Sequence, residues 1–180
     1  FTTVKKPTET NPNGLNSKYV LDNFVVGSNN DIAVAAAKSI IDAPGTRFNP
    51  FFLYGGPGLG KTHLTLAITY ELLNKGFDVI YGAAYNLFSD METEHFDRHT
   101  NTKYNAAINC DLLVVDDLGG EFVSPYIQSL LYNIINTRDL ANKPTIINTN
   151  LTLKEIEELY SPRITSRLIG NFNANKFLGN

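Results

Sequence analysis

Residues 55–62 of this 180-residue chain, GGPGLGKT, have the residue types and the spacing of a loop that binds phosphate. Gly55, Gly60, Lys61 and Thr62 match the pattern G-x-x-x-x-G-K-[ST] in full. Glycines allow the backbone to wrap around an anion, and a helix that follows adds unpaired N–H groups at its positive end. We expect Lys61 to reach the outer phosphates of a nucleotide and the Thr62 hydroxyl to hold Mg²⁺. The alternative is a glycine-rich turn that only connects two elements.

Every residue of this loop is a candidate nucleotide contact, together with the histidine that follows it. The candidates are Gly55, Gly56, Pro57, Gly58, Leu59, Gly60, Lys61, Thr62 and His63. For His63 we expect a local packing contact or a contact on the phosphate side rather than a catalytic role.

A pair of carboxylates supplies the second half of the expected site. Asp116 and Asp117 end the apolar run LLVVDD, which is typical of a buried strand in a parallel sheet. We expect Asp116 to bind Mg²⁺ through water and Asp117 to face an attacking water as a base or an orienting group. Adjacent side chains at a strand end point in different directions, so the two carboxylates can have different roles. A strand that merely ends in polar residues is the alternative.

Two further polar pairs lie later in the chain. Asn148 and Asn150 end the run PTIINTN, at the edge of the sheet where ligands of such folds bind. An amide there can orient water near a γ-phosphate; the alternative is that these asparagines cap a helix expected near Thr152. Arg163 and Arg167 lie four residues apart, on one face of a helix. Such a pair is usually a solvated basic face, but Arg167 is a candidate arginine finger for the site of a neighbouring subunit.

Alternating strands and helices are expected to position these groups. Short apolar runs predict strands at residues 51–54, 78–82, 111–117, 144–150 and 176–178. Helical spacing predicts helices over residues 31–42, after Lys61, over 85–91, 104–108 and 127–135, and from residues 152 and 161. The first helix is expected to bury Ile32, Ala35, Ala36 and Ile40. The pattern predicts an α/β fold, a three-layer P-loop NTPase core whose parallel five-stranded sheet has helices on both faces.

Composition and charge limit the class of protein. Lys and Arg number 15 against 18 Asp and Glu, and the net charge of −3 does not indicate a strongly basic nucleic-acid binder. The single cysteine, Cys110, excludes an intramolecular disulfide and fits a reducing, cytoplasmic compartment, where we expect it to be a buried small hydrophobe. No apolar run approaches the length of a membrane span, so no membrane partner is expected.

The chain divides into two parts of unequal size. Residues 1–17 are polar and rich in turn-forming residues, and we expect a flexible tail or linker there. Residues 18–180 are expected to form one ATPase core domain. Because the first residue is Phe1 rather than Met, we expect the chain to be a piece of a longer protein.

Four motifs in this order carry a family resemblance: GGPGLGKTHL, LLVVDDLG, IINTNL and RITSRLIGNF. They resemble the AAA+ ATPases of bacterial replication initiation, and the likeness covers about Leu15 to Leu178. From LNSKYVLDNFVVGSNN through NPFFLYGGPGLGKTHL the chain is similar to the initiator DnaA. From INCDLLVVDDLGGE through SPRITSRLIGNF it is closer to DnaC-type helicase loaders. The lack of a recognisable helix-turn-helix and the short stretch after Arg167 favour the loader.

The resemblance implies roles for individual residues in hydrolysis. Residues 55–62 would be the Walker A motif, and Asp116 and Asp117 the Walker B motif. Asn150 would be the sensor-1 residue, and Arg167 the arginine finger acting in trans. Many AAA+ proteins have a glutamate in place of Asp117, and the shorter side chain implies slow intrinsic hydrolysis.

The resemblance also implies an adenine pocket and a reduced lid. The stretch NFVVGSNN, residues 23–30, would form the pocket, with Val25 and Val26 against the base. The helical lid with its sensor-2 arginine has no room in the 13 residues after Arg167, so the lid is expected to be absent or much reduced.

In this family, DNA would run along the helices between the second strand and the Walker B motif. That region has Arg98 and Lys103, but its local charge balance is not positive because it also contains Asp90, Glu92, Glu94 and Asp97. Single-stranded DNA binding is therefore expected to be weak. Its aromatic residues are expected to be core rather than a stacking platform: Tyr85, Phe88, Phe96 and Tyr104. His95 and His99 lack a third ligand and are expected on a solvated face, not in a metal site.

The leading interpretation is an ATP-binding and ATP-hydrolysing AAA+ domain of a replication helicase loader, with ATP or ADP and Mg²⁺ as cofactors. Subunits would self-associate through Arg167 and engage the replicative DNA helicase, through a segment expected before Phe1, and single-stranded DNA. The alternatives are a DnaA-like initiator, a transposition helper ATPase and a nucleotide-gated module with negligible hydrolysis. A small-molecule kinase is less favoured, because the asparagines and paired arginines have no evident role there.

Overall fold

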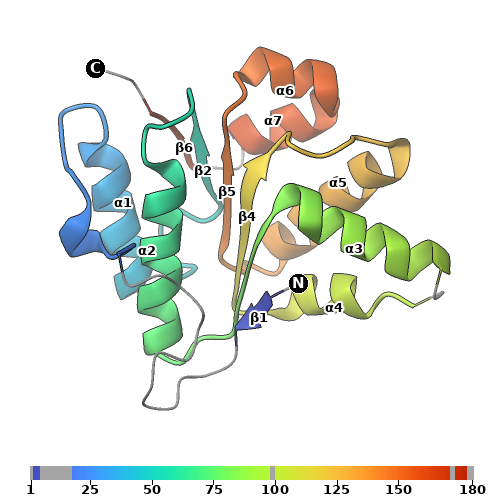
Figure 1. Ribbon diagram of the computed structural model, residues 1–180, viewed down its shortest axis with the longest axis horizontal. Helices are drawn as coiled ribbons and strands as arrows, with labels where there is room; N and C mark the ends of the chain where they lie inside the picture. The colour runs from blue at the N-terminus through green and yellow to red at the C-terminus, as the bar shows by residue number, and fades with distance from the viewer. Residues whose placement is uncertain (1, 5–17, 98–99, 171–172, 178–180) are drawn as a thin grey trace.

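The computed structural model describes residues 2–4, 18–97, 100–170 and 173–177 of the chain. Its centre is a six-stranded sheet with the order β1-β3-β4-β5-β2-β6 (Figure 1). Five of these strands are mutually parallel, as expected: β3 (Val79–Ala83), β4 (Leu112–Leu118), β5 (Thr145–Thr149), β2 (Phe51–Tyr54) and β6 (Asn173–Lys176). The sixth, β1 (Thr2–Val4), pairs antiparallel with β3 at one edge.

Both edges of the sheet differ from the sequence-based expectation. A flexible tail or linker was expected over residues 1–17, but residues 2–4 form the strand β1. Residues 5–17 lie outside the described part of the chain. The last strand was expected at residues 176–178, but β6 covers Asn173–Lys176. Its polar sequence, NANK, has no strand pattern, and backbone pairing with Phe51–Tyr54 places it in the sheet. Phe177 follows, buried, and donates its N–H to the Tyr54 carbonyl at 2.8 Å.

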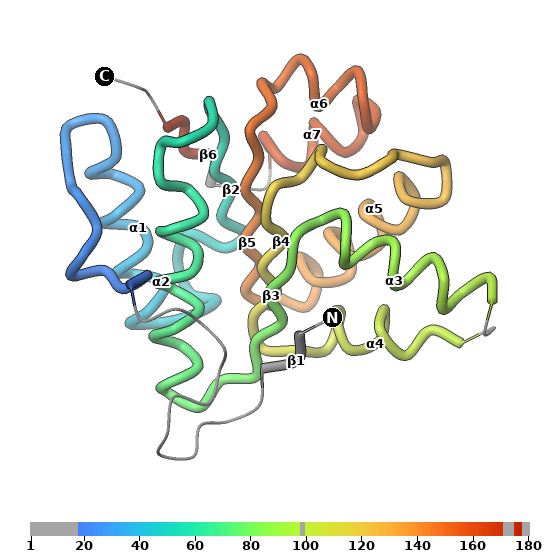
Figure 2. The backbone as a smooth tube through the Cα atoms, in the orientation of Figure 1, coloured from blue at the N-terminus to red at the C-terminus, as the bar shows by residue number. Residues whose placement is uncertain are grey.

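Helices cover both faces of the sheet, which confirms the three layers (Figures 1 and 2). One face carries α1 (Asp31–Asp42) and α2 (Lys61–Asn74), and the other carries α3 (Ala84–Asp97), α4 (Thr102–Asn109) and α5 (Pro125–Leu140). A short pair, α6 (Leu153–Leu159) and α7 (Pro162–Gly170), lies beyond the carboxyl ends of β4 and β5 (Figure 2). A 3₁₀ turn, Leu21–Asn23, precedes α1. Within the described ranges, no helix combines the length and apolar character that crossing a bilayer requires.

The alternation of side chains along the strands explains the two layers of core. Phe51 and Leu53 of β2 pack toward α1 and α2, whereas Phe52 between them packs toward α3, α4 and α5. The side chains of these three residues are fully buried. The sheet is therefore apolar on both faces, which leaves only its edges and strand ends for polar chemistry.

Two helices differ in detail from the expected pattern. In α1, Ile32 is 69% exposed and Ala35 is exposed, so the predicted buried face was wrong at these two positions. Ala36 and Ile40 are buried as expected, and Ala33, Val34 and Ala37 are buried where the pattern did not predict it. The third helix runs over Ala84–Asp97, well past the expected end at residue 91. Its polar extension is fixed by Glu94, whose carboxylate accepts the N–H of Lys103 at 2.7 Å.

A buried arginine joins α5 to the amino ends of the central strands. Arg138 is 0% exposed and donates to the carbonyls of Ala107, Cys110 and Pro144 at 2.7, 3.0 and 2.6 Å. It also donates to the Thr145 hydroxyl at 2.9 Å. Cys110 is buried as expected, and burial raises the pKa of its thiol. Carbonyls at the end of α4 and the start of β5 thus share one guanidinium.

Candidate nucleotide-binding site

The predicted phosphate loop lies between β2 and α2, in the strand–loop–helix context that its motif requires. Tyr54 ends the strand, and Lys61 begins the helix. The Lys61 ammonium donates to the carbonyls of Gly55 and Gly56 at 2.8 and 2.7 Å, across the width of the loop. The residue is only 4% exposed, so its charge is directed into the loop rather than into solvent.

Glycine is needed at both ends of the loop for different reasons. Gly60 precedes the helix in the left-handed region, with φ of 95°. Gly55 has φ of 138°, and a Cβ atom there would lie 2.3 Å from the carbonyl oxygen of Phe177. The loop can therefore start where it does only because its first residue has no side chain.

The charge of Lys61 is balanced by the two predicted carboxylates. Burial lowers the pKa of the Lys61 ammonium, and the nearby charges of Asp117 and Asp116 oppose that shift. The three residues therefore belong to one electrostatic unit, although Asp116 and Asp117 are more than fifty positions away in the sequence.

Thr62 and Asp116, the two residues predicted to hold Mg²⁺, are in contact. The Thr62 hydroxyl donates to Oδ1 of Asp116 at 3.1 Å, and Asp116 is 7% exposed. A hydroxyl and a carboxylate in contact are hard oxygen donors of the kind that Mg²⁺ prefers, and both belong to elements that border the phosphate loop. These two residues thus fit a magnesium ion bound next to a nucleotide phosphate.

A β-bulge separates the orientations of Asp116 and Asp117. In β4, Val115 pairs with Ile147 and Leu118 pairs with Thr149, so two residues on β4 oppose one residue on β5. Asp117 has φ of 54°, which turns its carboxylate out of the sheet, and its side chain is exposed where Asp116 is buried. The expectation that the adjacent carboxylates point in different directions is confirmed.

The two asparagines at the end of β5 have different surroundings. Asn148 is 2% exposed; its amide donates to Oδ1 of Asp116, and its oxygen accepts the N–H of Asp117 at 2.9 Å. Asn150 is exposed and donates to the Asp117 carboxylate at 2.7 Å. The alternative that these residues cap the next helix is wrong, because Thr152 caps α6 through a reciprocal pair of bonds with Glu155.

Tyr81 is a residue of the site that the sequence analysis missed. It lies on β3, and its hydroxyl donates to Oδ2 of Asp116. Burial raises the pKa of this phenol, and the hydrogen bond to Asp116 raises it further. A tyrosine is common in the middle of a strand, so the sequence alone does not mark it as functional. Only the pairing of β3 with β4 brings it to Asp116.

Glu121, which the sequence analysis also missed, fixes the turn that follows β4. Glu121 is 7% exposed, accepts the N–H of Gly119 at 3.0 Å and accepts the hydroxyl of Tyr160, which is fully buried at the end of α6. Burial raises the pKa of Tyr160, with Glu121 as the next cause. The end of β4 is thereby connected to the segment that leads into α7.

A cavity of about 440 Å³ opens over the carboxyl half of the loop. It is lined by Tyr19, Gly58, Leu59, Gly60, Lys61, Thr62 and Asn150. Neither Val25 nor Val26 lines it, and their side chains are 84% and 56% exposed. His63 packs edge-on against Tyr19 and Phe24, which matches the local packing contact that we expected.

The paired arginines lie away from this cavity. Arg167 packs on Tyr132 of α5, with its guanidinium carbon 5.6 Å from the ring centroid, and is 3.9 Å from Asp139. Arg163 lines a shallow cavity of about 340 Å³ between α5 and α7. The two arginines thus share one face of α7, as predicted.

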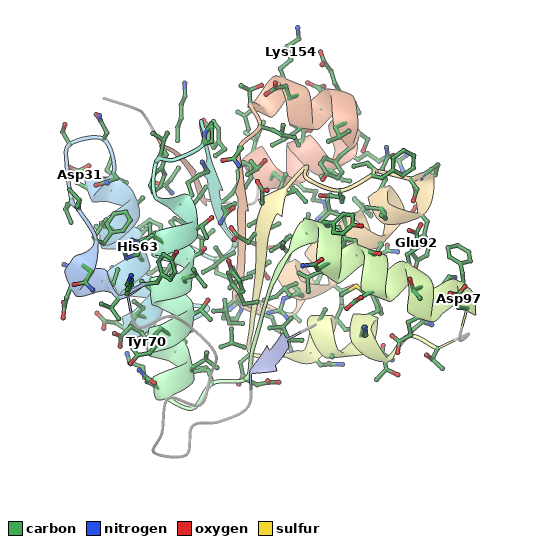
Figure 3. All side chains as sticks on the ribbon, viewed as in Figure 1. Asp31, His63, Tyr70, Glu92, Asp97 and Lys154 are labelled. Carbon is green, nitrogen blue, oxygen red and sulfur yellow. The ribbon has the colours of Figure 1, made fainter. Side chains whose placement is uncertain are left out.

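The region expected to face DNA divides into buried and exposed aromatics. Phe88 is core, whereas Tyr85 and Phe96 are 58% and 56% exposed, so the expectation of core packing was wrong for these two. His95 stacks on Tyr126 with centroids 5.0 Å apart. Within the part of the chain that the structure describes, no three His, Cys, Asp or Glu side chains are grouped so that they could hold a metal ion; His99 falls outside that part. Asp97 is exposed at the end of α3, whereas Glu92 is half-buried and accepts the Ser124 hydroxyl before α5 at 3.1 Å (Figure 3).

Comparison with known proteins identifies the family. The profile described as "Bacterial DnaA ATPAse domain" matches residues 15–174. The chromosomal replication initiator protein DnaA of Streptococcus mutans is 34% identical over 170 residues, which are 91% of this chain and 38% of that protein. The protein of the same name from Gloeothece citriformis is 36% identical over 171 residues, 90% of this chain and 35% of that protein. The chain therefore spans little more than a third of the length of these relatives.

Solved structures show the same fold. AMPPCP-bound DnaA from Aquifex aeolicus aligns with a TM-score of 0.85 and 32% identity, over 93% of this chain and 52% of that chain. A DnaC helicase loader aligns over 91% of this chain and 100% of that chain with a TM-score of 0.77, but at 22% identity it shows the fold alone. The leading interpretation as a loader is therefore less well supported than the DnaA alternative. By sequence and fold, the chain belongs to the bacterial DnaA ATPase domain family.

Proposed function

We propose that this chain binds ATP with Mg²⁺ and hydrolyses it as the ATPase unit of a replication initiator of DnaA type. One observation carries the proposal. A buried lysine occupies a loop of backbone amides, next to a threonine hydroxyl 3.1 Å from a carboxylate. These three groups in a strand–loop–helix setting are typical of proteins that bind a nucleoside triphosphate with Mg²⁺. The match to the DnaA ATPase domain family favours an initiator among them.

The loop is the part that receives the phosphates. In the arrangement described, the Lys61 ammonium is held by two loop carbonyls, so phosphate oxygens would replace those carbonyls as its acceptors. The N–H groups at the start of α2 and the helix dipole add to the attraction. Thr62 and Asp116 are the residues that would hold Mg²⁺, which neutralises charge on the outer phosphates.

Asp117 and Asn150 are the residues proposed to act on water. Asp117 is exposed beside the cavity, and Asn150 both lines the cavity and donates to the Asp117 carboxylate at 2.7 Å. A carboxylate and an amide in contact can orient one water molecule for attack on the γ-phosphate, with the proton passing to Asp117. Because the aspartate is one methylene shorter than a glutamate, we propose slow hydrolysis by the isolated subunit.

Arg167 is proposed to serve the site of a neighbouring subunit. Its guanidinium contacts Tyr132 and Asp139 of α5, not the loop of its own chain. The ion pair with Asp139 is long and partly exposed, so the guanidinium can leave it at little cost. A second copy that docks its loop against α7 would receive this charge at its γ-phosphate.

The adenine pocket is proposed near the start of α1. Val25 and Val26 are exposed apolar side chains that follow Phe24, whose ring lies against Gly60 of the loop. Asn30 holds their segment by accepting the N–H of Gly27 at 2.9 Å and donating to the Val25 carbonyl at 3.0 Å. A flat base would cover both valines and remove their apolar surface from water.

A direct test measures nucleotide binding by calorimetry with ATP or AMPPCP, with Mg²⁺ and with EDTA. Lys61→Ala should abolish binding, because the loop loses the charge that the phosphates need. Lys38→Ala is the matched control, since it removes an equal charge from the exposed face of α1. Failure of the wild-type protein to bind either nucleotide, or wild-type affinity in Lys61→Ala, would refute the proposal.

A helicase loader is the second candidate, favoured by the resemblance of residues 108–172 to DnaC-type loaders. A replication initiator DnaA has been solved with AMPPCP and single-stranded DNA, so DNA binding alone does not separate the two. Co-migration with the replicative helicase does. ATP-dependent co-migration in size-exclusion chromatography supports the loader, whereas ATP-dependent assembly on single-stranded DNA that excludes helicase supports the initiator.

A further inference from the structure

Asp116 is held by more donors than its proposed part in binding Mg²⁺ requires. Thr62 and Asn148 both donate to Oδ1, and the Tyr81 hydroxyl donates to Oδ2. The threonine belongs to the phosphate loop and the asparagine to the neighbouring strand β5. Tyr81 comes from β3, on the other side of β4, and neither the motif nor the family comparison assigns it a role.

The sheet register explains why Tyr81 reaches the carboxylate. Ala83 of β3 pairs with Asp116 of β4, and Tyr81 pairs with Val114, two residues earlier on each strand. Side chains two residues apart share a face of the sheet, so Tyr81 points the same way as Ala83 and extends along the strand toward Asp116. The residue opposite Asp116, Ala83, has only a methyl side chain.

We propose that Tyr81 is a positioning residue for the magnesium site, and that it fixes the Asp116 carboxylate in the orientation that places Oδ1 beside Thr62. The inference rests on the proposed function of that site. With Oδ2 occupied by the phenol, rotation of the carboxylate away from Thr62 would break a charge-assisted hydrogen bond in a buried setting. Outer-shell partners of this kind orient metal ligands, and their loss typically lowers metal affinity by about 10- to 100-fold.

The hydrogen bond from Tyr81 to Asp116 should affect only the Mg²⁺-dependent part of nucleotide binding. Tyr81 donates to Asp116 and not to the loop, whereas Lys61 is bound by Gly55 and Gly56. Removal of the phenolic oxygen should therefore leave the Mg²⁺-independent part of nucleotide binding intact. A tyrosine that only fills space in the core would affect stability and leave the dependence on Mg²⁺ unchanged.

The test is Tyr81→Phe, which keeps the ring and removes the donor. Binding of a fluorescent ATP analogue is titrated in EDTA and then at increasing Mg²⁺, and Mn²⁺ binding is followed independently by electron paramagnetic resonance. We expect wild-type affinity in EDTA and a Mg²⁺ midpoint about tenfold higher, with a matching loss of Mn²⁺ affinity. Tyr70→Phe is the control, because Tyr70 lies on the half of α2 remote from the loop (Figure 3).

The outcomes separate this inference from the proposed function. A wild-type protein that binds no nucleotide would refute both. A wild-type protein that binds, with a Tyr81→Phe variant whose Mg²⁺ midpoint is unchanged or lower, would refute the role of Tyr81 alone. If Tyr81→Phe melts too early for titration, the same measurements are made on both proteins at a lower temperature; a raised Mg²⁺ midpoint in the variant supports the proposal, and an unchanged one overturns it.

Discussion

Asn148 and Asn150 lie two positions apart at the end of one strand, and we predict that replacing each with alanine impairs a different property of the protein. Asn148 is buried and bonded to Asp116, to the Asp117 N–H and, at 3.3 Å, to the Thr65 hydroxyl. Asn150 is exposed and contacts only the Asp117 carboxylate among the contacts described. Asn148→Ala should therefore reduce stability, and Asn150→Ala should reduce hydrolysis.

The size of the Asn148 effect follows from its contacts. A hydrogen bond to a charged group contributes about 1.5–3 kcal/mol, and a buried donor left without its acceptor costs about 1–3 kcal/mol. Allowing for partial replacement by water at Asp117, we expect a loss of about 3 kcal/mol in the free energy of unfolding. That is a large part of the 5–15 kcal/mol that is typical of such domains.

For Asn150→Ala we expect little change in stability and a large loss of hydrolysis. An exposed substitution is expected to change stability by no more than about 0.5 kcal/mol. Hydrolysis should fall about tenfold or more, since the amide orients a carboxylate that acts on water. Nucleotide affinity should stay at the wild-type value, because Lys61 and Thr62 are untouched.

Urea unfolding and steady-state phosphate release measure the two effects in the same preparations. Asn86→Ala, an exposed asparagine on α3, controls for loss of an amide as such. If Asn148→Ala unfolds at the wild-type urea concentration, or if Asn150→Ala hydrolyses ATP at the wild-type rate, the division of roles argued from burial is refuted.

Three further outcomes are expected. Arg138→Leu should destabilise the fold by about 3 kcal/mol or more in urea, because three backbone carbonyls lose a buried donor; wild-type stability would contradict this. The pKa values of Tyr81 and Tyr160 are raised in the folded state, so their contribution to stability is complete below the unfolded pKa of about 10 and is lost as pH rises above it. The urea midpoint should therefore fall between about pH 9 and pH 11, by less in a Tyr81→Phe, Tyr160→Phe double variant. Arg167→Ala should bind ATP normally but lose about 10³-fold or more in assembly-stimulated hydrolysis. Mixing it with Lys61→Ala subunits should restore part of that rate, and no restoration would refute action in trans.

The phosphate loop and its carboxylates were predictable because their signals are local. A strand of four apolar residues, a loop rich in glycine and a helix that begins at the lysine follow one another in the chain. The different directions of Asp116 and Asp117 were also predictable, because adjacent side chains on a strand alternate, but the bulge after Val115 was not. In each case the chemistry is decided by residues within about ten positions, and no knowledge of strand order is needed.

Asn148 was not assigned correctly, and Tyr81 was missed, because their contact with Asp116 depends on the order of the strands. Consecutive strands β2 and β3 are not neighbours in this sheet; β4 and β5 are inserted between them. Asp116 therefore receives donors from β3 on one side and β5 on the other, more than thirty positions away in each direction. When the order of the strands is unknown, the sequence does not show which residue a tyrosine in the middle of a strand contacts. Once the order is known, however, polar residues near the carboxyl ends of the strands that flank β4 become the first candidates for holding its carboxylate, which is the reasoning that Tyr81→Phe tests.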